Sequence, residues 1–580
     1  MEKQDFIWKM GGQQGQGVES CGEILGRVLA QEGYSLFSQR LFASRIKGGH
    51  TTMALRIATK EVATIGERVD CLVALDQETI DLHGKEIPEG GVIIADGAFR
   101  PKWEGEGVKL LPLPITDMAK KYGSMQMKNM AALGMSAGLL GFPESPFYQF
   151  IADRFAKKGD EVISKNKEIF KEGYDTAVAA MGGKSLGKLP TPEKKDQLYV
   201  LGNEAAALGA ISAGSRFMAS YPITPASEIM EYMIKVVKKI HGTVVQTEDE
   251  LSSVMMAMGA GYAGVRGFTA TSGPGLSLMA ESISMASMAE IPVVIIDVMR
   301  AGPSTGMATK VEQSDIRYAI ASGHGDAEKI VLAASSIEDC YYIVQEAFNL
   351  AEEFQTPVIV LSDLQFGMCK QSVAAFDLNR VPIKRGKLVK DGLPELDLKA
   401  KTYFHRFEDV EDGISPRTIP GVKNGWFLST GLEHNVFGKP AEGQGDRVQQ
   451  MEKRHRKYAG VSKAIKPFTA AHEETETDLL LVGVTSTNGA IEEAREALEA
   501  EGKKVNHLQL RLLSPFPTEE LAPYIKGAKK VLIVEEDLTA QLRELFAIHF
   551  DCHDKLLSLL QYDGTPFKAS TILAKAKEVY

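Results

Sequence analysis

The middle of the chain alternates short apolar runs with helical segments, and this alternation constrains the fold more than any other feature. Runs such as GFTATS, IPVVIIDVM and TPVIVLS are continuous, apolar and bounded by turn residues, as is typical of strands buried on both faces of a parallel sheet. Helical periodicity separates the runs at 227–239, 251–263, 276–289 and 337–354. The pattern predicts a doubly wound α/β domain over residues 196–370.

The same alternation occurs at both ends of the chain. FIWKM, a glycine-rich turn, a helix over 18–31 and the buried runs CLVAL and GVIIADG predict a first open α/β domain over residues 1–188. DLLLVGV, KVNHLQL and KKVLIVEED predict a third over 477–580. The segment GGKSLGKLPTPEKKDQ has the composition of a linker. Residues 371–476 lose all periodicity, and we expect them to be a connector that wraps another domain or serves function.

Composition and charge exclude several classes of protein. Of the 580 residues, 44% are hydrophobic and 24% charged, which is typical of a globular chain, and the net charge of -10 offers no basic face for nucleic acid. The start, MEKQDFIWKM, has no apolar core of a signal peptide, and no run of ~18 apolar residues occurs. We therefore expect a cytoplasmic protein that binds neither nucleic acid nor membrane.

The cysteines form no metal-binding motif. No CxxC pair occurs, so the sequence predicts neither a zinc site nor an iron–sulfur cluster in this chain, and no metal ligand is assigned. The five cysteines are expected to be small buried residues. They are Cys21, Cys71, Cys340, Cys369 and Cys552.

The stretch ASYPITPASEIME holds a stiff loop. Pro222 and Pro225 bracket Ile223 and Thr224, which fixes two φ angles and favours extended backbone before each proline. Ser227 then provides the chemistry of a helix start. The loop presents Thr224 at the entry of a helix, although a purely structural turn with a helix cap would have the same pattern.

This loop, together with GGQQGQG at the front and VEEDLTAQL near the end, resembles the 2-oxoacid:ferredoxin oxidoreductases. The chain is most similar to the subunit that joins gamma and alpha parts, as in the alpha subunit of 2-oxoglutarate:ferredoxin oxidoreductase. The resemblance implies a gamma-like domain over 1–188, a thiamine diphosphate pyrimidine-binding domain over 196–370, the connector, and a transketolase C-terminal-like domain over 477–580.

The resemblance implies thiamine diphosphate as cofactor, and a carboxylate must then hydrogen-bond N1′ of its aminopyrimidine. Glu248 in VVQTEDELSS resembles that glutamate by its spacing to TSGPG, and Glu250 is the alternative. Both also fit ordinary acids at the first turn of a helix. Cofactor contacts are also expected from Pro222, Ile223 and Ser272.

An anionic substrate requires a cation. Arg300 follows a buried strand, at the carboxyl edge where α/β sheets bind ligands, and its guanidinium matches a carboxylate. The position resembles the family's substrate arginine, and Thr309 resembles a second substrate-pocket residue. Thr224 would donate its hydroxyl to the substrate's keto oxygen or carboxylate, so the expected catalytic set is Thr224, Glu248 and Arg300; Lys310 has no assigned role.

Two expected motifs do not occur in the chain. The GDG turn that holds the metal ion of the cofactor's diphosphate is absent, and so is a cluster-binding cysteine run. The resemblance implies a separate beta subunit with the diphosphate-binding domain, Mg²⁺ and a four-iron four-sulfur cluster, in an α2β2 assembly. The implied reaction is CoA-dependent oxidative decarboxylation of a 2-oxoacid, favouring 2-oxoglutarate, with electrons passing to ferredoxin. Pyruvate or another 2-oxoacid, or a noncatalytic binding or assembly subunit, are the alternatives.

The opening turn GGQQGQG does not have the GxGxxG order of a dinucleotide site. Its backbone amides precede a helix, where any phosphate can bind. The resemblance favours CoA as that ligand, at Gly15, Gln16 and Gly17 with Arg45 and Lys47, and the alternative is a plain structural turn.

A second acidic group lies near the C-terminus. Glu535, Glu536 and Asp537 follow the apolar run KKVLIV. We interpret them as a solvated loop that leads into a helix N-terminus rather than as a site.

Overall fold

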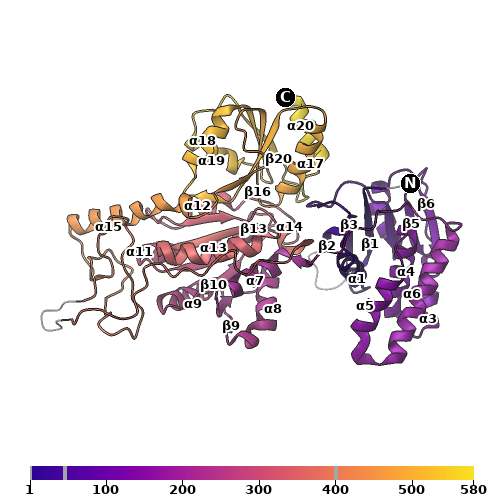
Figure 1. Cartoon of the computed structure of the whole chain (residues 1–580), viewed down its shortest axis with the longest axis horizontal. Coiled ribbons are helices and arrows are strands. Elements are labelled where there is room, and N and C mark those ends of the chain that lie inside the picture. Colours follow the sequence, from indigo (N-terminus) through magenta and orange to yellow (C-terminus); the bar gives the residue numbers. More distant parts are fainter. Residues whose placement is uncertain (1–2, 43–48, 397–402) are drawn as a thin grey trace. The chain divides into compact units, whose positions relative to one another are not determined.

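A computed structural model describes residues 3–42, 49–396 and 403–580, which form two compact units (Figure 1). The first unit contains the chain up to residue 201 together with residues 368–375, and the second contains 202–367 and everything from 376 onward. Within the described ranges, no helix combines the length and the apolar character needed to cross a membrane.

The first unit is a mixed sheet covered by helices on both faces. Its strand order is β6 (Lys109–Leu113), β5 (Val92–Asp96), β4 (Cys71–Ala74), β1 (Asp5–Gln13), β3 (His50–Ala58), β2 (Ser35–Phe42), β14 (Lys370–Ala374) and β7 (Gln197–Leu201). Its helices are α1 (Val18–Gln31), α2 (Gln77–His83), α3 (Ile115–Lys121), α4 (Lys128–Leu140), α5 (Ser145–Phe155) and α6 (Asp160–Ala180). Alternate residues of β1 point to opposite faces: Phe6 and Trp8 join the core under α1 and α4, and Ile7 joins a smaller core with Ile80 of α2.

Two features of this sheet differ from the sequence-based expectation. β2 and β3 are antiparallel to their neighbours, whereas only parallel strands were predicted in the first domain. The strand LYVL, expected to open the second domain, is β7, and it pairs with β14 at the edge of the first sheet. The chain therefore returns to the first unit after the last parallel strand of the central sheet.

The central sheet of the second unit is parallel except at one edge. Its order is β18 (Leu512–Ser514), β12 (Ile330–Ala333), β13 (Pro357–Asp363), β11 (Val293–Met299), β10 (Gly267–Thr271), β8 (Phe217–Ser220) and β9 (Thr243–Gln246), with β18 antiparallel. Its helices are α7 (Gly202–Ser212), α8 (Ser227–Val236), α9 (Glu250–Tyr262), α10 (Gly273–Leu278), α11 (Ala280–Met288), α12 (Ile316–Ala321), α13 (Asp339–Phe354) and α14 (Leu364–Met368). The strand order reverses at β8, with β9 on one side and β10 on the other.

The C-terminal sheet has the order β15 (Phe468–Ala470), β17 (Val505–Leu510), β16 (Thr477–Val484), β19 (Ala528–Glu535) and β20 (Leu556–Leu560). Its helices α17 (Thr487–Ala500) and α20 (Ala569–Val579) lie on one side, and α18 (Thr518–Gly527) and α19 (Gln541–His549) lie on the other (Figure 1). Leu479 and Leu481 pack toward the first pair, while Leu480 and Val482 pack toward the second. This alternation explains why the run LLLV over residues 479–482 is apolar at every position.

The connector is held to the central domain by buried ion pairs. It has little regular structure before α15 (Gln444–Arg456) and the short α16 (Val461–Ala464). The side chains of Glu290 and Lys453 are both fully buried, with Lys453 Nζ 2.6 Å from Glu290 Oε1. Lys457 Nζ lies 3.5 Å from Oε2, and Arg406 donates to the Glu290 carbonyl at 2.7 Å. Although burial opposes ionisation, these cations lower the pKa of Glu290.

A second buried carboxylate performs the same role. Glu352 of α13 accepts from Arg417 of the connector at 2.8 Å and from Arg266 at 3.0 Å. All three side chains are nearly inaccessible to solvent. Because an unpaired buried charge is costly, the connector's cations are stable only where these two carboxylates meet them.

We predict that Glu290→Gln destabilises the second unit by about 3–5 kcal/mol, because it leaves buried Lys453 and Lys457 without a carboxylate. Differential scanning calorimetry and limited proteolysis of the connector measure the effect. Glu578→Gln is the control, since the Glu578 side chain is 68% exposed and its loss should not move the transition. An unchanged transition for Glu290→Gln would contradict the structural role of this pair.

Candidate active site

Four neighbouring strands of the central sheet end at the same edge, and each is followed by a segment that the sequence singled out. The order β9, β8, β10, β11 is parallel throughout, with Ser220 opposite Gln246 and Thr271 opposite Asp297. Their carboxyl ends lead into TED, YPITP, SGPG and Arg300 respectively. The strand order reverses here, and ligands of open α/β sheets bind at such a point.

Arg300 and Thr224 are brought together at this edge. Nη1 of Arg300 donates to the Thr224 carbonyl at 2.6 Å, and Nη2 donates to the Thr305 carbonyl at 3.0 Å. The side chain is only 7% exposed, and its Nε has no hydrogen-bond partner among the described residues. Burial lowers the pKa of Arg300, and nearby Asp315 opposes that shift. The guanidinium therefore remains a cation with an unused donor.

The segment after Arg300 forms a closed loop. The Ala301 amide donates to the Lys310 carbonyl at 3.0 Å, and the Met307 amide donates to the Ala301 carbonyl at 2.9 Å. Thr309 and Lys310 are half-buried at the base of this loop, whereas residues 303–307 are exposed. The hydrogen bond between Ala301 and Lys310 thus closes the loop and keeps Thr309 and Lys310 close to Arg300.

The two candidate glutamates have different environments. Asp249 is the N-cap of α9, and its carboxylate accepts from the Ser252 amide at 2.7 Å; this hydrogen bond lowers the pKa of Asp249. Glu248 lies outside the helix and is exposed. Glu250 is the first helical residue and only 7% exposed, and a Cβ added at Gly275 would lie 2.6 Å from its Oε1. The Glu250 carboxylate therefore packs against the SGPG turn.

That turn provides a polar group without a partner. Ser272 precedes α10 and is fully buried, and its Oγ makes no hydrogen bond within the described part of the chain. Pro222 is exposed and Ile223 half-buried in the neighbouring YPITP loop. The helix after this loop begins as predicted at Ser227, but its N-cap residue is Ala226.

The sequence-based reasoning missed a buried carboxyl pair next to Arg300. Asp297 on β11 is inaccessible to solvent, and neither of its carboxyl oxygens has a partner in the described structure. Burial and Asp315 raise the pKa of Asp297 well above its usual range. Burial and Glu312 raise the pKa of Asp315 to about 6, against the effect of Arg300. An acid within the apolar run IIDVM was the available signal for this pair.

The C-terminal acidic group is not solvated, so that prediction was wrong. Glu535, Glu536 and Asp537 are at most 2% exposed. Gln313 covers them. Its backbone N–H donates to the Glu536 carbonyl at 2.7 Å, and its side-chain oxygen accepts from the backbone N–H of Glu536 at 2.9 Å. Glu535 accepts from the Leu542 amide at 2.6 Å, so the expected helix N-terminus is confirmed. Burial and Asp537 raise the pKa of Glu535 to about 8.

The glycine-rich turn of the first unit lies between β1 and α1. Gly15 and Gly17 have φ values of 94° and 84°, which favour glycine, and a Cβ at Gly17 would lie 1.8 Å from Asn129 Nδ2. Gly15 and Gln16 are exposed at the helix N-terminus. Arg45 and Lys47 lie outside the described residues.

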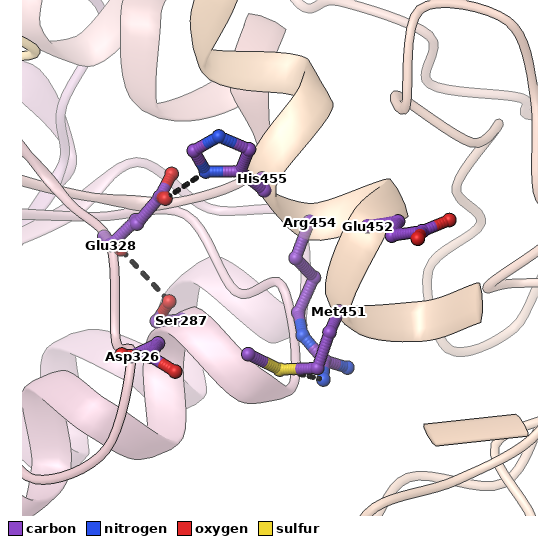
Figure 2. Close-up of a pocket in the computed structure, with 7 residues that line it drawn as sticks. All are labelled: Ser287, Asp326, Glu328, Met451, Glu452, Arg454 and His455. Carbon is purple, nitrogen blue, oxygen red and sulfur yellow. Dashed lines mark hydrogen bonds and ion pairs between the residues drawn. The ribbon is translucent and has the colours of Figure 1, made fainter. Parts of the chain in front are cut away.

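A cavity of about 390 Å³ lies between α15 and the segment before β12 (Figure 2). His455 of α15 pairs with Glu328, and Ser287 Oγ donates to the Glu328 carbonyl at 2.8 Å. Ser287 precedes β11 and Glu328 precedes β12, so the cavity lies at the amino edge of the central sheet. That is the edge opposite Arg300, and the cavity is not part of the candidate active site.

The parallel sheet, its strand-order reversal and the buried Arg300–Thr224 pair define an open α/β protein with a candidate ligand site at the carboxyl edge. Three family profiles match the chain: "Pyruvate flavodoxin/ferredoxin oxidoreductase, thiamine diP-bdg" over residues 208–454, "Pyruvate ferredoxin/flavodoxin oxidoreductase" over 7–176, and "Pyruvate:ferredoxin oxidoreductase core domain II" over 477–556. The 2-oxoacid:ferredoxin oxidoreductase 2 subunit alpha of Aeropyrum pernix is 34% identical, over 99% of this chain and 98% of the relative. The chain belongs to the alpha subunits of the 2-oxoacid:ferredoxin oxidoreductases, and it is a subunit of a thiamine diphosphate-dependent enzyme.

Two further relatives are similar over long segments. The 2-oxoglutarate synthase subunit KorA of Methanothermobacter thermautotrophicus is 36% identical, over 60% of this chain and 90% of the relative. A 2-oxoglutarate:ferredoxin oxidoreductase from Magnetococcus marinus, solved with 2-oxoglutarate, coenzyme A and succinyl-CoA bound, matches with a TM-score of 0.93, 34% identity and complete coverage of both chains. The expected family and fold class are confirmed.

The residues at the carboxyl edge fit an aminopyrimidine ring. The buried Glu250 carboxyl group lies against the SGPG turn, and the buried Ser272 hydroxyl has no partner of its own among the described residues. Gly273 and Gly275 leave no room for side chains in this turn, because an added Cβ would lie 2.5 Å from Asp315 Oδ1 and 2.1 Å from Thr271 Oγ1 respectively. Backbone and polar side chains thus form the surface of the turn.

We predict that Asp297→Asn increases thermal stability by a margin that grows with pH. Folding raises the pKa of Asp297, so the wild type loses stability as pH rises above the unfolded-state pKa, by about 1.4 kcal/mol per pH unit until the folded-state pKa is reached. The asparagine side chain of the variant does not ionise, so its contribution to stability does not change with pH. Thermal midpoints at pH 5 and pH 8 measure the difference, with the exposed Asp551→Asn as control. A margin that shrinks toward pH 8 would contradict the buried protonated acid.

Proposed function

We propose that the chain is the alpha subunit of an enzyme that converts 2-oxoglutarate and CoA to succinyl-CoA and carbon dioxide, with electrons passing to ferredoxin. The observation that carries the proposal is the Arg300–Thr224 pair beside the Glu250 and Ser272 turn, at the point where the strand order reverses. The substrate is supported by the relatives named for 2-oxoglutarate, one of which matches over the whole chain.

In this proposal Arg300 binds the carboxylate next to the keto group. Two of its nitrogens are held by the Thr224 and Thr305 carbonyls, so the guanidinium is fixed before substrate arrives, and its Nε faces no partner among the described residues. The Thr224 hydroxyl donates to the keto oxygen, and Thr309 lines the pocket. Lys310, at the base of the same loop, is a second cation suited to a dicarboxylate.

Glu250, rather than Glu248, is the residue we assign to N1′ of the aminopyrimidine. Its carboxylate is buried against the SGPG turn, while Glu248 is exposed and lies outside the helix. Ser272, Pro222 and Ile223 complete the cradle around the ring. When bound, thiamine diphosphate supplies the electron sink for decarboxylation.

The chain requires a second subunit for the remaining half of the site. It contains neither a GDG turn nor a cluster-binding cysteine run, so we assign the diphosphate-binding domain, Mg²⁺ and a four-iron four-sulfur cluster to a beta subunit in an α2β2 assembly.

Helix α9 has no charged residue after Glu250, yet Leu251, Met255 and Met256 are 39–44% exposed. A helix with so few charged or polar side chains is normally buried, so this face, which begins at the glutamate assigned to the cofactor, is the proposed docking surface for that subunit.

CoA is assigned to the glycine-rich turn of the first unit. The turn Gly15–Gly17, in which Gly15 and Gln16 are exposed, precedes the 14-residue helix α1, and the N-terminus of a helix is a favourable site for phosphate. Arg45 and Lys47 remain predictions from the sequence. CoA is one of the ligands bound in the Magnetococcus marinus relative.

The function is tested by expressing the chain with a beta-type subunit and measuring viologen reduction with 2-oxoglutarate, pyruvate and branched 2-oxoacids, with and without CoA. We expect CoA-dependent reduction with the highest kcat/KM for 2-oxoglutarate. A preference for pyruvate would overturn the substrate, and no activity with any 2-oxoacid would favour a binding or assembly subunit.

In the same assay we predict that Glu250→Gln lowers kcat by about 10²–10⁴-fold, the usual contribution of a positioned acid–base group. Glu248→Gln is the matched control, two residues away and exposed, and should retain near wild-type activity. The opposite result would assign the aminopyrimidine contact to Glu248.

We predict that Met255→Glu prevents copurification of the beta subunit without unfolding the chain, because it places a charge in an apolar interface that is solvated in the free chain. Ile548→Glu, at a residue 70% exposed on α19, is the control and should copurify normally. Retention of the beta subunit by Met255→Glu would place the docking surface elsewhere.

A further inference from the structure

Three side chains of the first unit converge beside the end of β1. His50 begins β3, Asp76 follows β4 as the N-cap of α2, and Glu78 lies in the first turn of α2. One potential ligand atom from each lies within 4.8 Å of the other two. None of the three belongs to the carboxyl edge of the central sheet or to the glycine-rich turn.

A chain of hydrogen bonds and ion pairs reaches Nε2 of His50. Lys9 pairs with Glu86, which also accepts from His83 Nδ1 at 2.6 Å. Although burial opposes it, these partners lower the pKa of Glu86 to about 2, so Glu86 is a carboxylate and His83 Nδ1 carries the proton. His83 Nε2 and His50 Nε2 are 3.0 Å apart.

It follows that Nε2 of His50 is occupied by His83, which leaves Nδ1 as the ring nitrogen that can bind a ligand. Burial and His83 lower the pKa of His50, against the effect of Asp76 and Glu78. His50 Nδ1 is buried and has no hydrogen-bond partner in the described structure.

One side-chain oxygen of Asp76 accepts hydrogen bonds, and the other has no partner among the described residues. Its Oδ1 accepts from the amide and the hydroxyl of Thr79, at 2.9 and 2.7 Å, whereas its Oδ2 is buried and unpartnered within the described residues. One imidazole nitrogen and one carboxylate oxygen are thus buried without a hydrogen-bond partner among the described residues, close to the exposed carboxylate of Glu78. A divalent cation among the three groups satisfies both buried atoms.

We propose that His50, Asp76 and Glu78 bind a divalent transition-metal cation of the Zn²⁺ or Mn²⁺ class. One imidazole nitrogen and two carboxylates are ligands that these ions accept at about 2.0–2.2 Å. The three ligand atoms lie within 4.8 Å of one another, which is close enough for all three to contact one ion after small side-chain rotations. The second nitrogen of His50 is oriented by His83, as metal-binding histidines usually require. The site binds metal through residues of the first unit alone, and so it does not depend on the proposed function.

The test uses the full chain, freed of metal with a chelator and titrated calorimetrically with Zn²⁺ alone and Mn²⁺ alone. We expect one saturable equivalent of at least one ion. Asp76→Asn should weaken it at least ~100-fold, because the amide oxygen still caps α2 while its NH₂ donates to His50 Nδ1 and takes the cation's place. The variant should therefore fold normally, with a thermal midpoint that no longer rises when metal is added.

His553→Ala, which removes an exposed histidine, is the control for adventitious binding and should titrate like the wild type. His50→Gln is a second variant that should also lose the site. The proposal is overturned if neither ion binds saturably, or if a stoichiometric ion persists in both Asp76→Asn and His50→Gln. Absence of binding would mean that a proton, not a metal, satisfies the three acceptors.

Discussion

The parallel order of β9, β8, β10 and β11 is the constraint on which the candidate site depends. Because parallel strands present their carboxyl ends at one edge, four segments separated by up to eighty residues of sequence meet there. Arg300 then joins two of them through the Thr224 and Thr305 carbonyls. The guanidinium thus fixes the YPITP loop and the loop after β11 in one geometry, which the single, freely rotating ammonium group of a lysine would not do.

The buried charges of the connector attach it to the central domain. Residues between β14 and α15 form almost no regular structure among those described, so they cannot bury their own backbone within a sheet or helix. Glu290 and Glu352 provide fixed carboxylates on the central domain, and Lys453 and Arg417 meet them at 2.6 and 2.8 Å. Misplacing the connector would leave these charges buried and unpaired, so the ion pairs specify one path for the chain.

The sequence predicted the regular elements well where apolar runs were continuous, including α1, β10, β11 and β13. It did not predict that β2 and β3 are antiparallel or that β7 and β14 return to the first sheet, because pairing partners are determined by long-range contacts that leave no periodic signal. Spacing alone also left Glu248 and Glu250 open. The N-cap at Asp249 separates them: it leaves Glu248 outside α9 and directs Glu250 against the SGPG turn.

Helix α9 begins in the candidate site and carries the exposed residues that we propose as a docking face. Its first residue is the buried Glu250, and no charged residue follows in the helix, although Met255 and Met256 are about two-fifths exposed in the single chain. A helix with so few polar side chains is normally covered on both faces. The central sheet covers one face, and we propose that the beta subunit covers the other. One rigid helix then bears both the carboxylate that we assign to the cofactor and the contact with the partner, so in this proposal assembly also fixes the position of Glu250.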